Sequence, residues 1–300
     1  MKRNTTKYEV VVVGGGHAGL EAALISHKRG IKTALISMDK ESVGRTSCNP
    51  AVGGLAKGQM VKEVDVLGGI MGMFADMSTL QSKTLNKSKG RSVWSPRSQI
   101  DKNLYEKIAQ KHVKAVGLSL IEGEVTALSV ENNEIVGVVL KDNTKISCRS
   151  VVLTCGTFLN GLIHIGERQI PAGRFDEKRS EGITEFLSSY GLTAGRLKTG
   201  TPPRVERSSV DLSKGEADFG DKKPKPLSYR TEDFNPKNEP CFSFRTGEKT
   251  HKTILKNLHT SAMYSGKNMA TGPRYCPSIE DKVNRFKQNP SHLLQLEPEW

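Results

Sequence analysis

A run of β-branched residues that ends in glycines, close to the amino terminus, constrains the fold more than any other feature. Four valines at residues 10–13 lead into Gly14, Gly16 and Gly19, which have the spacing G-x-G-x-x-G, and an apolar helical stretch follows. In the order strand, turn, helix, this spacing is typical of a dinucleotide site, because the second glycine lets the backbone approach a pyrophosphate. The positive end of the helix would then face the phosphates. The predicted binding residues are Gly14, Gly15, Gly16, His17, Ala18 and Gly19.

The strand that follows the first helix predicts where the ribose of the dinucleotide would bind. Residues 33–36 form a second apolar run. An acidic residue about 20 positions beyond the glycines usually binds a ribose hydroxyl. Ser37 occupies that position, and Asp39 is the nearest acidic residue. We therefore expect the Ser37 hydroxyl or the Asp39 carboxylate to make this contact.

Three short strands are predicted at residues 119–129, 134–140 and 145–153, because β-branched residues are frequent there and turn-forming asparagines separate the runs. A three-stranded meander after a dinucleotide-binding βαβ unit is common in flavoproteins, so it favours FAD over a free nicotinamide cofactor. Residues 151–157 also have the pattern of a buried strand that returns to the nucleotide-binding sheet. The predicted fold class is α/β, with a Rossmann-like FAD-binding domain of the glutathione-reductase type, a β-meander and an inserted second α/β domain.

Helical periodicity predicts helices at residues 56–67, 98–112 and 180–190. In the first of these, we expect one apolar face to point inward and Asp65 to lie on another face. The inward face would consist of Met60, Val61, Val64 and Leu67. A further helix is expected after Ser278, because Ser278 and Asp281 have the S-x-x-D spacing of a capping box.

Two stretches have the composition of loops. Residues 197–241 are rich in proline, lysine and glycine, which is typical of extended loops. Residues 83–97 hold five basic residues around Trp94. Such a basic loop is most often a solvated surface. The alternative is a phosphate-binding surface on which Trp94 stacks against a base.

The net charge and the cysteines narrow the class of protein. The 300 residues carry a formal net charge of +13. Such a charge is typical of proteins that bind a polyanionic partner, and nucleic acid is one candidate. The five cysteines are scattered, which predicts neither a disulfide framework nor a metal site. No apolar stretch approaches the roughly 20 residues that span a bilayer. We therefore expect a cytoplasmic protein that does not associate with a membrane.

Three sequence blocks together resemble one family closely. They are GGGHAGLEAA at 14–23, SCNPAVGG at 47–54 and GPRYCPSIEDK at 272–282, and residues 155–161 and 195–204 fit the same pattern. On these residues the chain resembles the MnmG family, also called glucose-inhibited division protein A, from about residue 8 to residue 299. The second and third blocks are far more specific than the glycine motif.

The resemblance implies an FAD-dependent enzyme that modifies the wobble uridine of certain tRNAs. Members use FAD, NADH and a methylene group from methylenetetrahydrofolate, and with the GTPase MnmE they add an aminomethyl or carboxymethylaminomethyl group to uridine C5. They are homodimers that join MnmE in a heterotetramer. The resemblance also implies that this chain is a fragment without the carboxy-terminal helical region. Residues 1–200 would form the FAD-binding domain, and residues 201–300 an incomplete inserted domain for NAD and substrate.

The resemblance assigns residues to the two nucleotides. Besides the glycine turn, Val125 and Ser180 match positions that contact FAD in the family. The segment assigned to NAD matches Gly272, Pro273, Arg274, Tyr275, Cys276, Pro277, Ser278, Ile279, Glu280, Asp281, Lys282, Val283, Asn284, Arg285 and Phe286.

The chemistry of uridine modification points to two cysteines. Uridine C5 attacks a one-carbon electrophile only after a nucleophile has added to C6, and a thiolate is suitable because it attacks and leaves readily. Cys48 and Cys276 are the candidate catalytic residues, since both have arginines nearby in the sequence and both lie in the family blocks. The hypothesis is that one of them attacks or relays, while FAD supplies reducing equivalents that NADH restores.

Two other functions stay open at this point. One is an oxidoreductase that uses FAD and NAD(P)H on a small metabolite, which explains the glycine turn and the meander but not the charge or the block around Cys48. The other is a nucleotide-bound scaffold without catalysis. Binding of tRNA at a stated salt concentration separates the first from a tRNA enzyme, because phosphate contacts weaken steeply with salt.

Overall fold

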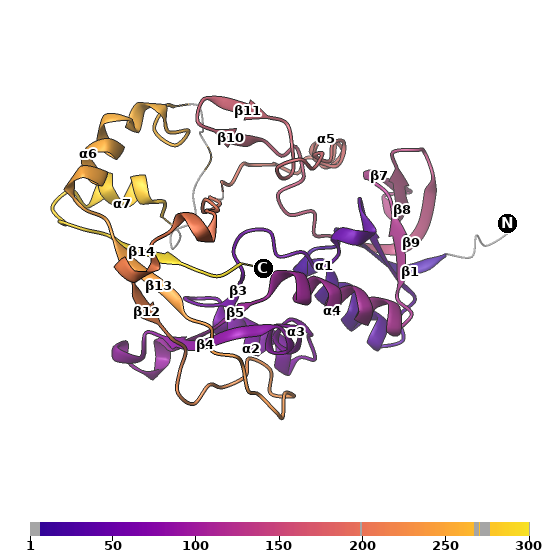
Figure 1. The fold of residues 1–300 in the computed structure, drawn as a ribbon. Helices are drawn as coiled ribbons and strands as arrows, with labels where there is room; N and C mark the ends of the chain where they lie inside the picture. The colour runs from indigo at the N-terminus through magenta and orange to yellow at the C-terminus, as the bar shows by residue number, and fades with distance from the viewer. Residues whose placement is uncertain (1–6, 199, 267–269, 271–276, 300) are drawn as a thin grey trace.

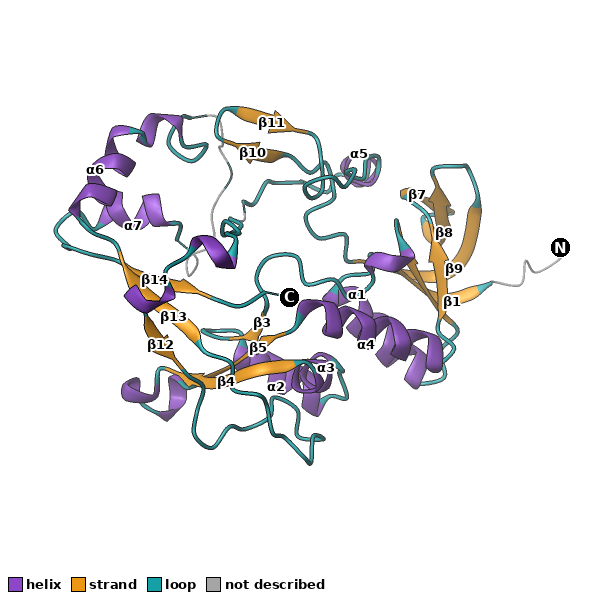
Figure 2. Cartoon of the chain, viewed as in Figure 1, coloured by secondary structure: helices purple, strands orange, loops and turns teal. Residues whose placement is uncertain are grey.

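The computed structural model describes residues 7–198, 200–266, 270 and 277–299, and Figure 1 shows their path. Regular strands and helices are concentrated in the first half of the chain (Figure 2). Long loops make up most of residues 190–198 and 200–240, as the composition of residues 197–241 predicts. None of the helices formed by the described residues is long and apolar enough to cross a bilayer.

The largest sheet has the strand order β6-β2-β1-β9-β8-β7. Val12 of β1 lies opposite Leu35 of β2 on one side and opposite Val152 of β9 on the other, and both pairings are parallel. This confirms that the chain returns to the nucleotide-binding sheet at residues 151–153. The elements are β1 (Tyr8–Val13), α1 (His17–Lys28), β2 (Thr33–Ser37), β6 (Ser119–Glu122), β7 (Val125–Glu131), β8 (Glu134–Leu140) and β9 (Lys145–Leu153).

The side chains of β1 alternate between two cores, because successive residues of a strand point to opposite faces. Val12 packs with Leu20 of α1 and Leu35 of β2 in one hydrophobic cluster. Val11 and Val13 pack in a second cluster with residues of the meander. Both faces of β1 are therefore covered, which explains a continuous apolar run instead of an alternating one.

The predicted meander differs from the structure at its first strand. Residues 119–129 form two strands, because β6 runs parallel to β2 whereas β7 pairs antiparallel with β8. The break falls at Gly123, whose N–H donates to the carbonyl of Ser37 at 2.9 Å. The other two strands lie where they were predicted. β9 belongs to both parts of the sheet, since it pairs with β8 and with β1.

A second sheet, which is antiparallel and was not predicted, has the order β3-β5-β4. The ends of the stretch 83–97 belong to its strands, so the predicted basic loop is shorter than that stretch. The elements of this region are β3 (Ala51–Gly53), α2 (Gly58–Val66), α3 (Met71–Met77), β4 (Thr79–Leu85), β5 (Ser95–Ile100) and α4 (Lys102–Ala115).

Helix α4 begins later than predicted. Residues 98–100 lie in β5, and the helix starts after Asp101, whose carboxylate accepts a hydrogen bond from the N–H of Leu104 at 2.9 Å. A cap of this kind fixes the first turn of a helix. Ile100 is fully buried in the sheet while Leu104 is exposed, so their helical spacing does not reflect a shared face.

Helix α2 turns a different face to the core than its apolar spacing predicts. Val61 is buried, but Met60, Val64 and Leu67 are exposed. Asp65 points inward instead and is 3 % exposed, because a distant loop donates hydrogen bonds to its carboxylate. The prediction of the inward face of this helix was therefore wrong for three of its four apolar residues.

Short elements make up the last part of the chain. Ser278 caps α7 by accepting a hydrogen bond from the N–H of Asp281, which confirms the predicted cap. The elements are β10 (Ile163–Ile165), β11 (Arg168–Ile170), α5 (Ile183–Ser189), β12 (Glu216–Asp218), β13 (Cys241–Arg245), α6 (Glu248–Lys256), α7 (Ile279–Arg285) and β14 (Leu293–Leu296). Single 3-10 turns lie at Lys40–Ser42, Lys87–Lys89, Arg91–Val93, Arg207–Ser209, Leu212–Lys214 and Leu258–Thr260.

Candidate functional site

The glycine turn joins β1 to α1 at the carboxyl edge of the parallel strands. Gly14 has a φ of +112°, and a Cβ at this position would lie 2.5 Å from the carbonyl oxygen of Thr154. A Cβ on Gly19 would lie 1.8 Å from the carbonyl oxygen of Gly14. The packing of the protein itself therefore requires these two glycines, one for the turn and one for the close contact between helix and strand.

Gly16 differs from its neighbours because the fold does not require a glycine there. Its φ is −73°, which any residue adopts, and a Cβ built on it meets no atom within 4 Å. It lies exposed at the N-cap of α1, where the first N–H groups of a helix have no partner within the helix. A pyrophosphate on these N–H groups would account for Gly16, because any side chain would stand between them. The residues of the turn therefore fit a dinucleotide.

His17, the first residue of α1, is fixed against α4. Its ring packs edge to face on Tyr105 with the centroids 5.4 Å apart, and the Tyr105 hydroxyl lies 3.4 Å from Nδ1. Burial lowers the pKa of His17 to about 4, so the imidazole is neutral at physiological pH. A neutral, packed ring shapes the turn and adds no charge to it.

Ser37 and Asp39 lie at the end of β2, beside the turn. The Ser37 side chain is buried, and its hydroxyl donates to the backbone carbonyl of Asp39 at 2.8 Å. The Asp39 carboxylate is exposed and accepts a hydrogen bond from the N–H of Glu41 at 2.9 Å. Of the two side chains predicted for a ribose contact, Asp39 is thus the accessible one.

Val125 and Ser180 lie on segments that contact each other at the same edge of the sheet. The N–H of Glu181 donates to the carboxylate of Glu124 at 3.2 Å, which joins the residue after Ser180 to the residue before Val125. Val125 packs in the same cluster as Val13, at the end of β1. Both side chains are buried. The topology therefore gathers the glycine turn, Val125 and Ser180 in one region.

Cys48 is an exposed free thiol on the loop that leads into β3. This loop is tied to the glycine turn, since the N–H of Gly44 donates to the carbonyl of Gly15 at 2.9 Å. The Cys48 sulfur lies 3.7 Å from the carbonyl oxygen of Gly200. The Cys48 carbonyl accepts a hydrogen bond from Arg204 Nη2 at 2.9 Å.

The other cysteines in the described part of the chain are less accessible. Cys148 and Cys241 are buried, and Cys155 is half-buried. Burial raises the pKa of the Cys155 thiol, and it raises that of Cys241 to about 11. A raised pKa disfavours the thiolate. Because Cys48 is the exposed one among these four cysteines, it is the thiol that solvent and a substrate reach most easily.

The second candidate thiol, Cys276, lies outside the described residues, as do Gly272, Pro273, Arg274 and Tyr275. The rest of the predicted NAD segment forms α7 and its cap. Asp281 is buried there and accepts hydrogen bonds from the Tyr264 hydroxyl at 2.8 Å and from Arg285 Nε at 2.9 Å. Figure 1 shows α7 and α1 well apart.

The basic stretch 83–97 mostly binds carboxylates of the chain itself. Arg91 lies over the ring of Trp94, 5.8 Å from its centroid, and the indole N–H donates to the Lys87 carbonyl at 3.2 Å. Three of the five basic side chains form ion pairs with later segments: Lys83 with Asp218, Lys87 with Asp221 and Arg97 with Glu297. These contacts favour the structural interpretation of the stretch over a free phosphate-binding surface.

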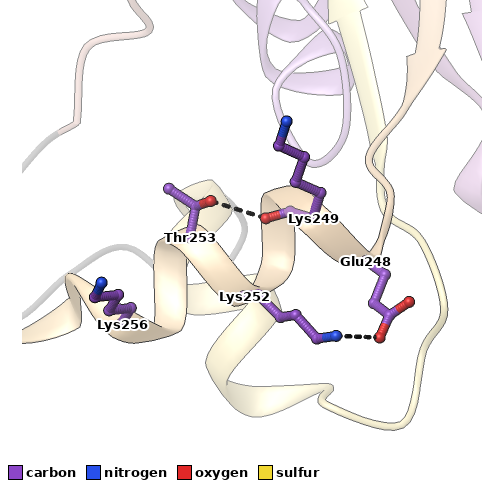
Figure 3. Close-up of a pocket in the computed structure, with 5 residues that line it drawn as sticks. All are labelled: Glu248, Lys249, Lys252, Thr253 and Lys256. Atoms are coloured by element: carbon purple, nitrogen blue, oxygen red, sulfur yellow. Dashed lines mark hydrogen bonds and ion pairs between the residues drawn. The ribbon is translucent and has the colours of Figure 1, made fainter.

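Two surface concavities carry charged side chains. One, of about 370 Å³, runs along α6, where Figure 3 shows Lys249, Lys252 and Lys256 projecting from the helix. The other, of about 570 Å³, lies beside the Cys48 loop and is lined by Glu41, Arg45, Thr46, Ser47, Lys102, Asn103, Glu106, Lys107, Gln110 and Arg174. The described residues contain no group of His, Cys, Asp and Glu side chains placed to hold a metal ion.

Three residues around Cys48 were not singled out from the sequence. They are Arg174 and Arg204, which reach the Cys48 loop from more than 120 positions away, and Glu299, which binds Arg204. The available signal was the block at 195–204, which ends in Arg204 and fits the family pattern. Nothing in the spacing of Arg174 or Glu299 indicated a contact with this loop.

The model of the family described as "Glucose inhibited division protein A" matches residues 9–300. The chain belongs to this family. Among its relatives, the tRNA uridine 5-carboxymethylaminomethyl modification enzyme MnmG of Thermodesulfovibrio yellowstonii is 46% identical over 293 residues, which cover 97% of this chain and 47% of the relative. The enzyme of the same name from Aliarcobacter butzleri is 47% identical over 296 residues, with the same two coverages.

Solved structures of the glucose-inhibited division protein A family have the same fold. A structure of Aquifex aeolicus GidA superposes with a TM-score of 0.89 at 41% identity and covers 98% of this chain and 48% of that one. A second crystal form of the same protein gives a TM-score of 0.90 at 43% identity, covering 97% of this chain and 50% of that one. The predicted fold class is thereby confirmed. The chain spans about half the length of the family members that it matches.

Proposed function

We propose that this chain is part of an FAD- and NADH-dependent enzyme that modifies tRNA. The product would carry an aminomethyl or carboxymethylaminomethyl group on C5 of the wobble uridine, U34. The names of the relatives support this activity, since they are called tRNA uridine 5-carboxymethylaminomethyl modification enzymes. The observation that carries the proposal is the hydrogen bond between Gly15 and Gly44, because it ties a turn that fits a dinucleotide to the loop of an exposed thiol.

FAD, when bound, would supply the reducing equivalents of the reaction. Gly16 and the amino terminus of α1 would hold its pyrophosphate, and the exposed Asp39 carboxylate would accept a hydrogen bond from the ribose. Val125 and Ser180 would support the same edge of the sheet, where their segments meet. His17 would stay neutral, because its low pKa keeps the proton off the ring.

Cys48 would act on the uridine itself. Its thiolate forms a bond to C6 and moves an electron pair onto the C4 carbonyl oxygen, which makes C5 nucleophilic. C5 then bonds to the methylene carbon of methylenetetrahydrofolate as the bond from that carbon to one folate nitrogen breaks, and the nitrogen of glycine or ammonium later displaces the other folate nitrogen. When C5 has lost its proton to a base, the electron pair returns and the sulfur leaves C6. Cys276 is the other candidate for this step or for a relay.

The remaining partners of the proposed enzyme follow from the family resemblance. NADH would bind at residues 272–286, and the GTPase MnmE would join a homodimer of the protein in a heterotetramer. The formal net charge of +13 supports a polyanionic substrate such as tRNA. We propose the cytoplasm as the location.

The test is modification of U34 by the whole protein with MnmE, NADH and methylenetetrahydrofolate, after its absorption spectrum has shown bound flavin. Cys48→Ser should abolish turnover, whereas Cys155→Ser, which changes a half-buried cysteine on another strand end, should leave turnover near the unmodified level. Full turnover in both Cys48→Ser and Cys276→Ser would overturn the thiol mechanism. Flavin bands without any tRNA product would favour an oxidoreductase that acts on a small metabolite.

A further inference from the structure

We propose that Arg204 is a positioning residue for Cys48 and that Glu299 positions Arg204. The inference rests on the role of Cys48 proposed above and adds two residues to it. Both come from segments that are far from Cys48 in the sequence. What brings them together is a chain of hydrogen bonds that ends on the backbone of the cysteine.

The guanidinium of Arg204 is held in one orientation. Nη2 donates to the carbonyl oxygen of Cys48 at 2.9 Å, and Nη1 donates to the carbonyl of Pro202 at 2.9 Å. Nε donates to the carboxylate of Glu299 at 3.1 Å. All three nitrogens thus have partners, and the planar group bridges three different segments. The bond from Arg204 reaches the Cys48 carbonyl, whereas the Cys48 thiol donates to the carbonyl oxygen of Gly200 at 3.7 Å.

Glu299 is itself anchored. Its carboxylate pairs with Lys102, the first residue of α4, at 2.5 Å. Burial opposes its ionisation, but the hydrogen bonds from Lys102 and Arg204 outweigh burial and lower the pKa of Glu299. It is therefore charged at neutral pH. The two residues before it are also bound, since Glu297 pairs with Arg97 at 2.5 Å and the Pro298 carbonyl accepts from Gln99.

The loop is fixed on both sides of Cys48 as well. The Ser47 hydroxyl accepts a hydrogen bond from Arg174 Nη1 at 2.7 Å. On the other side, the carbonyl of Pro50 accepts from the N–H of Ile100 at 2.8 Å, at the start of the β3 and β5 pairing. Arg204 adds a third hydrogen bond between these two contacts, at the carbonyl of Cys48.

The physical consequence concerns the direction of the thiol. A surface loop without such anchors samples many backbone conformations, and each one places the sulfur differently. A nucleophile reacts fast only when it is held close to its target in the correct orientation, and a shift of about 1 Å lowers a rate by about 100-fold. Because Arg204 fixes the peptide unit of Cys48, it fixes the starting point of the side chain.

The experiment compares four variants of the whole protein with bound flavin: Arg204→Ala, Arg204→Lys, Glu299→Gln and Arg207→Ala. Arg207→Ala is the matched control, because Arg207 is exposed on the same segment and its side chain forms no hydrogen bond or ion pair within the described part of the chain. Four quantities are measured: kcat, KM for tRNA, hydrogen exchange of the peptide that covers residues 46–50, and the midpoint of thermal unfolding.

Arg204→Ala should lower kcat by about 10-fold to 100-fold, while KM for tRNA changes by less than about 3-fold. Exchange at residues 46–50 should become faster, because the loop opens more often. Arg204→Lys should recover part of kcat, since it keeps the charge but not the planar fork. Glu299→Gln should lower kcat and speed up exchange at residues 46–50, as Arg204→Ala does. Arg207→Ala should change neither quantity.

The proposal is overturned if Arg204→Ala leaves kcat and the exchange of residues 46–50 unchanged. It is also overturned if kcat falls only in proportion to a loss of folded protein, as the unfolding midpoint and Arg207→Ala would show. Failure of the proposed function looks different. In that case the flavin-bound protein forms no tRNA product, and if only the role of Cys48 fails, Cys48→Ser keeps full turnover. The exchange measurement needs no catalysis, so in both cases it still reports whether Arg204 holds the loop.

Discussion

Asp65 of α2 accepts a hydrogen bond from Arg230 Nη2 at 2.7 Å, although 165 residues separate the two. The carboxylate is almost fully buried, and it also accepts hydrogen bonds from the Ser228 hydroxyl and the Tyr229 N–H. Burial opposes its ionisation, but the hydrogen bonds from Arg230, Ser228 and Tyr229 outweigh burial and lower the pKa of Asp65. A loop of the last third of the chain is thus fastened to α2 through one charged side chain.

Asp65→Asn should destabilise the protein by about 2 to 3 kcal/mol, because Arg230 and the backbone donors lose a charged acceptor. The midpoint of urea unfolding measures this change. Glu248→Gln is the control, since Glu248 forms an exposed ion pair with Lys252 at 2.7 Å and such pairs contribute less than about 1 kcal/mol. Equal effects of the two substitutions would contradict the role of burial at Asp65.

The stability difference between the unmodified protein and Asp65→Asn should depend on pH in one direction. The folded pKa of Asp65 lies below its ordinary value of 3.8, so the carboxylate contributes its full stabilisation above that value. The contribution should disappear as the pH falls below 3.8 toward the folded pKa. Unfolding curves of both proteins between neutral pH and acid pH measure the gap, and a gap that widens on acidification would refute the assignment.

Substitutions of two glycines in the turn should separate folding from cofactor binding. Gly19→Ala should destabilise the protein by about 3 kcal/mol or more, because its Cβ would overlap the carbonyl of Gly14. Gly16→Ala should cost only about 1 kcal/mol of stability, the usual effect at an N-cap. Gly16→Ala should nevertheless weaken the binding of FAD by about tenfold, or about 1.4 kcal/mol.

Thermal unfolding of the apoprotein and titration with FAD measure these two effects. If Gly16→Ala bound FAD as tightly as the unmodified protein, the pyrophosphate would not lie against this position. If Gly19→Ala were as stable as the unmodified protein, the helix would not pack on the turn as described.

His17 should make the folded state less stable as the pH falls from 6.5 to about 4. Burial lowers the pKa of His17 from 6.5 to about 4, so in this window the unfolded chain binds a proton that the folded chain does not. The loss should reach about 2 kcal/mol, since part of the ring is accessible to water. His17→Gln should remove this loss of stability. The measurement is the unfolding free energy of each protein across this window.

Several parts of the fold were predictable because their signals are local. The strand at residues 8–13, the glycine turn and the start of α1 follow from a few consecutive residues, and so does the Ser278 cap of α7. The antiparallel sheet of β3, β4 and β5 escaped prediction because its strands contain polar residues, and Ser98 and Gln99 are buried in it without an apolar pattern. The inward face of helix α2 was predicted wrongly because its apolar residues do not all face the core.

The sequence by itself determined the glycine turn between β1 and α1, since the φ of Gly14 and the close approach of Gly19 are properties of a short stretch. It also determined the family, through blocks that are contiguous. Only the tertiary structure decided which groups surround Cys48 and Asp65, because their hydrogen-bond partners lie between 152 and 165 positions away in segments with no periodic pattern. Hydrogen bonds between such segments form only when the fold brings the segments together, and the spacing of residues along the sequence does not show which segments will meet.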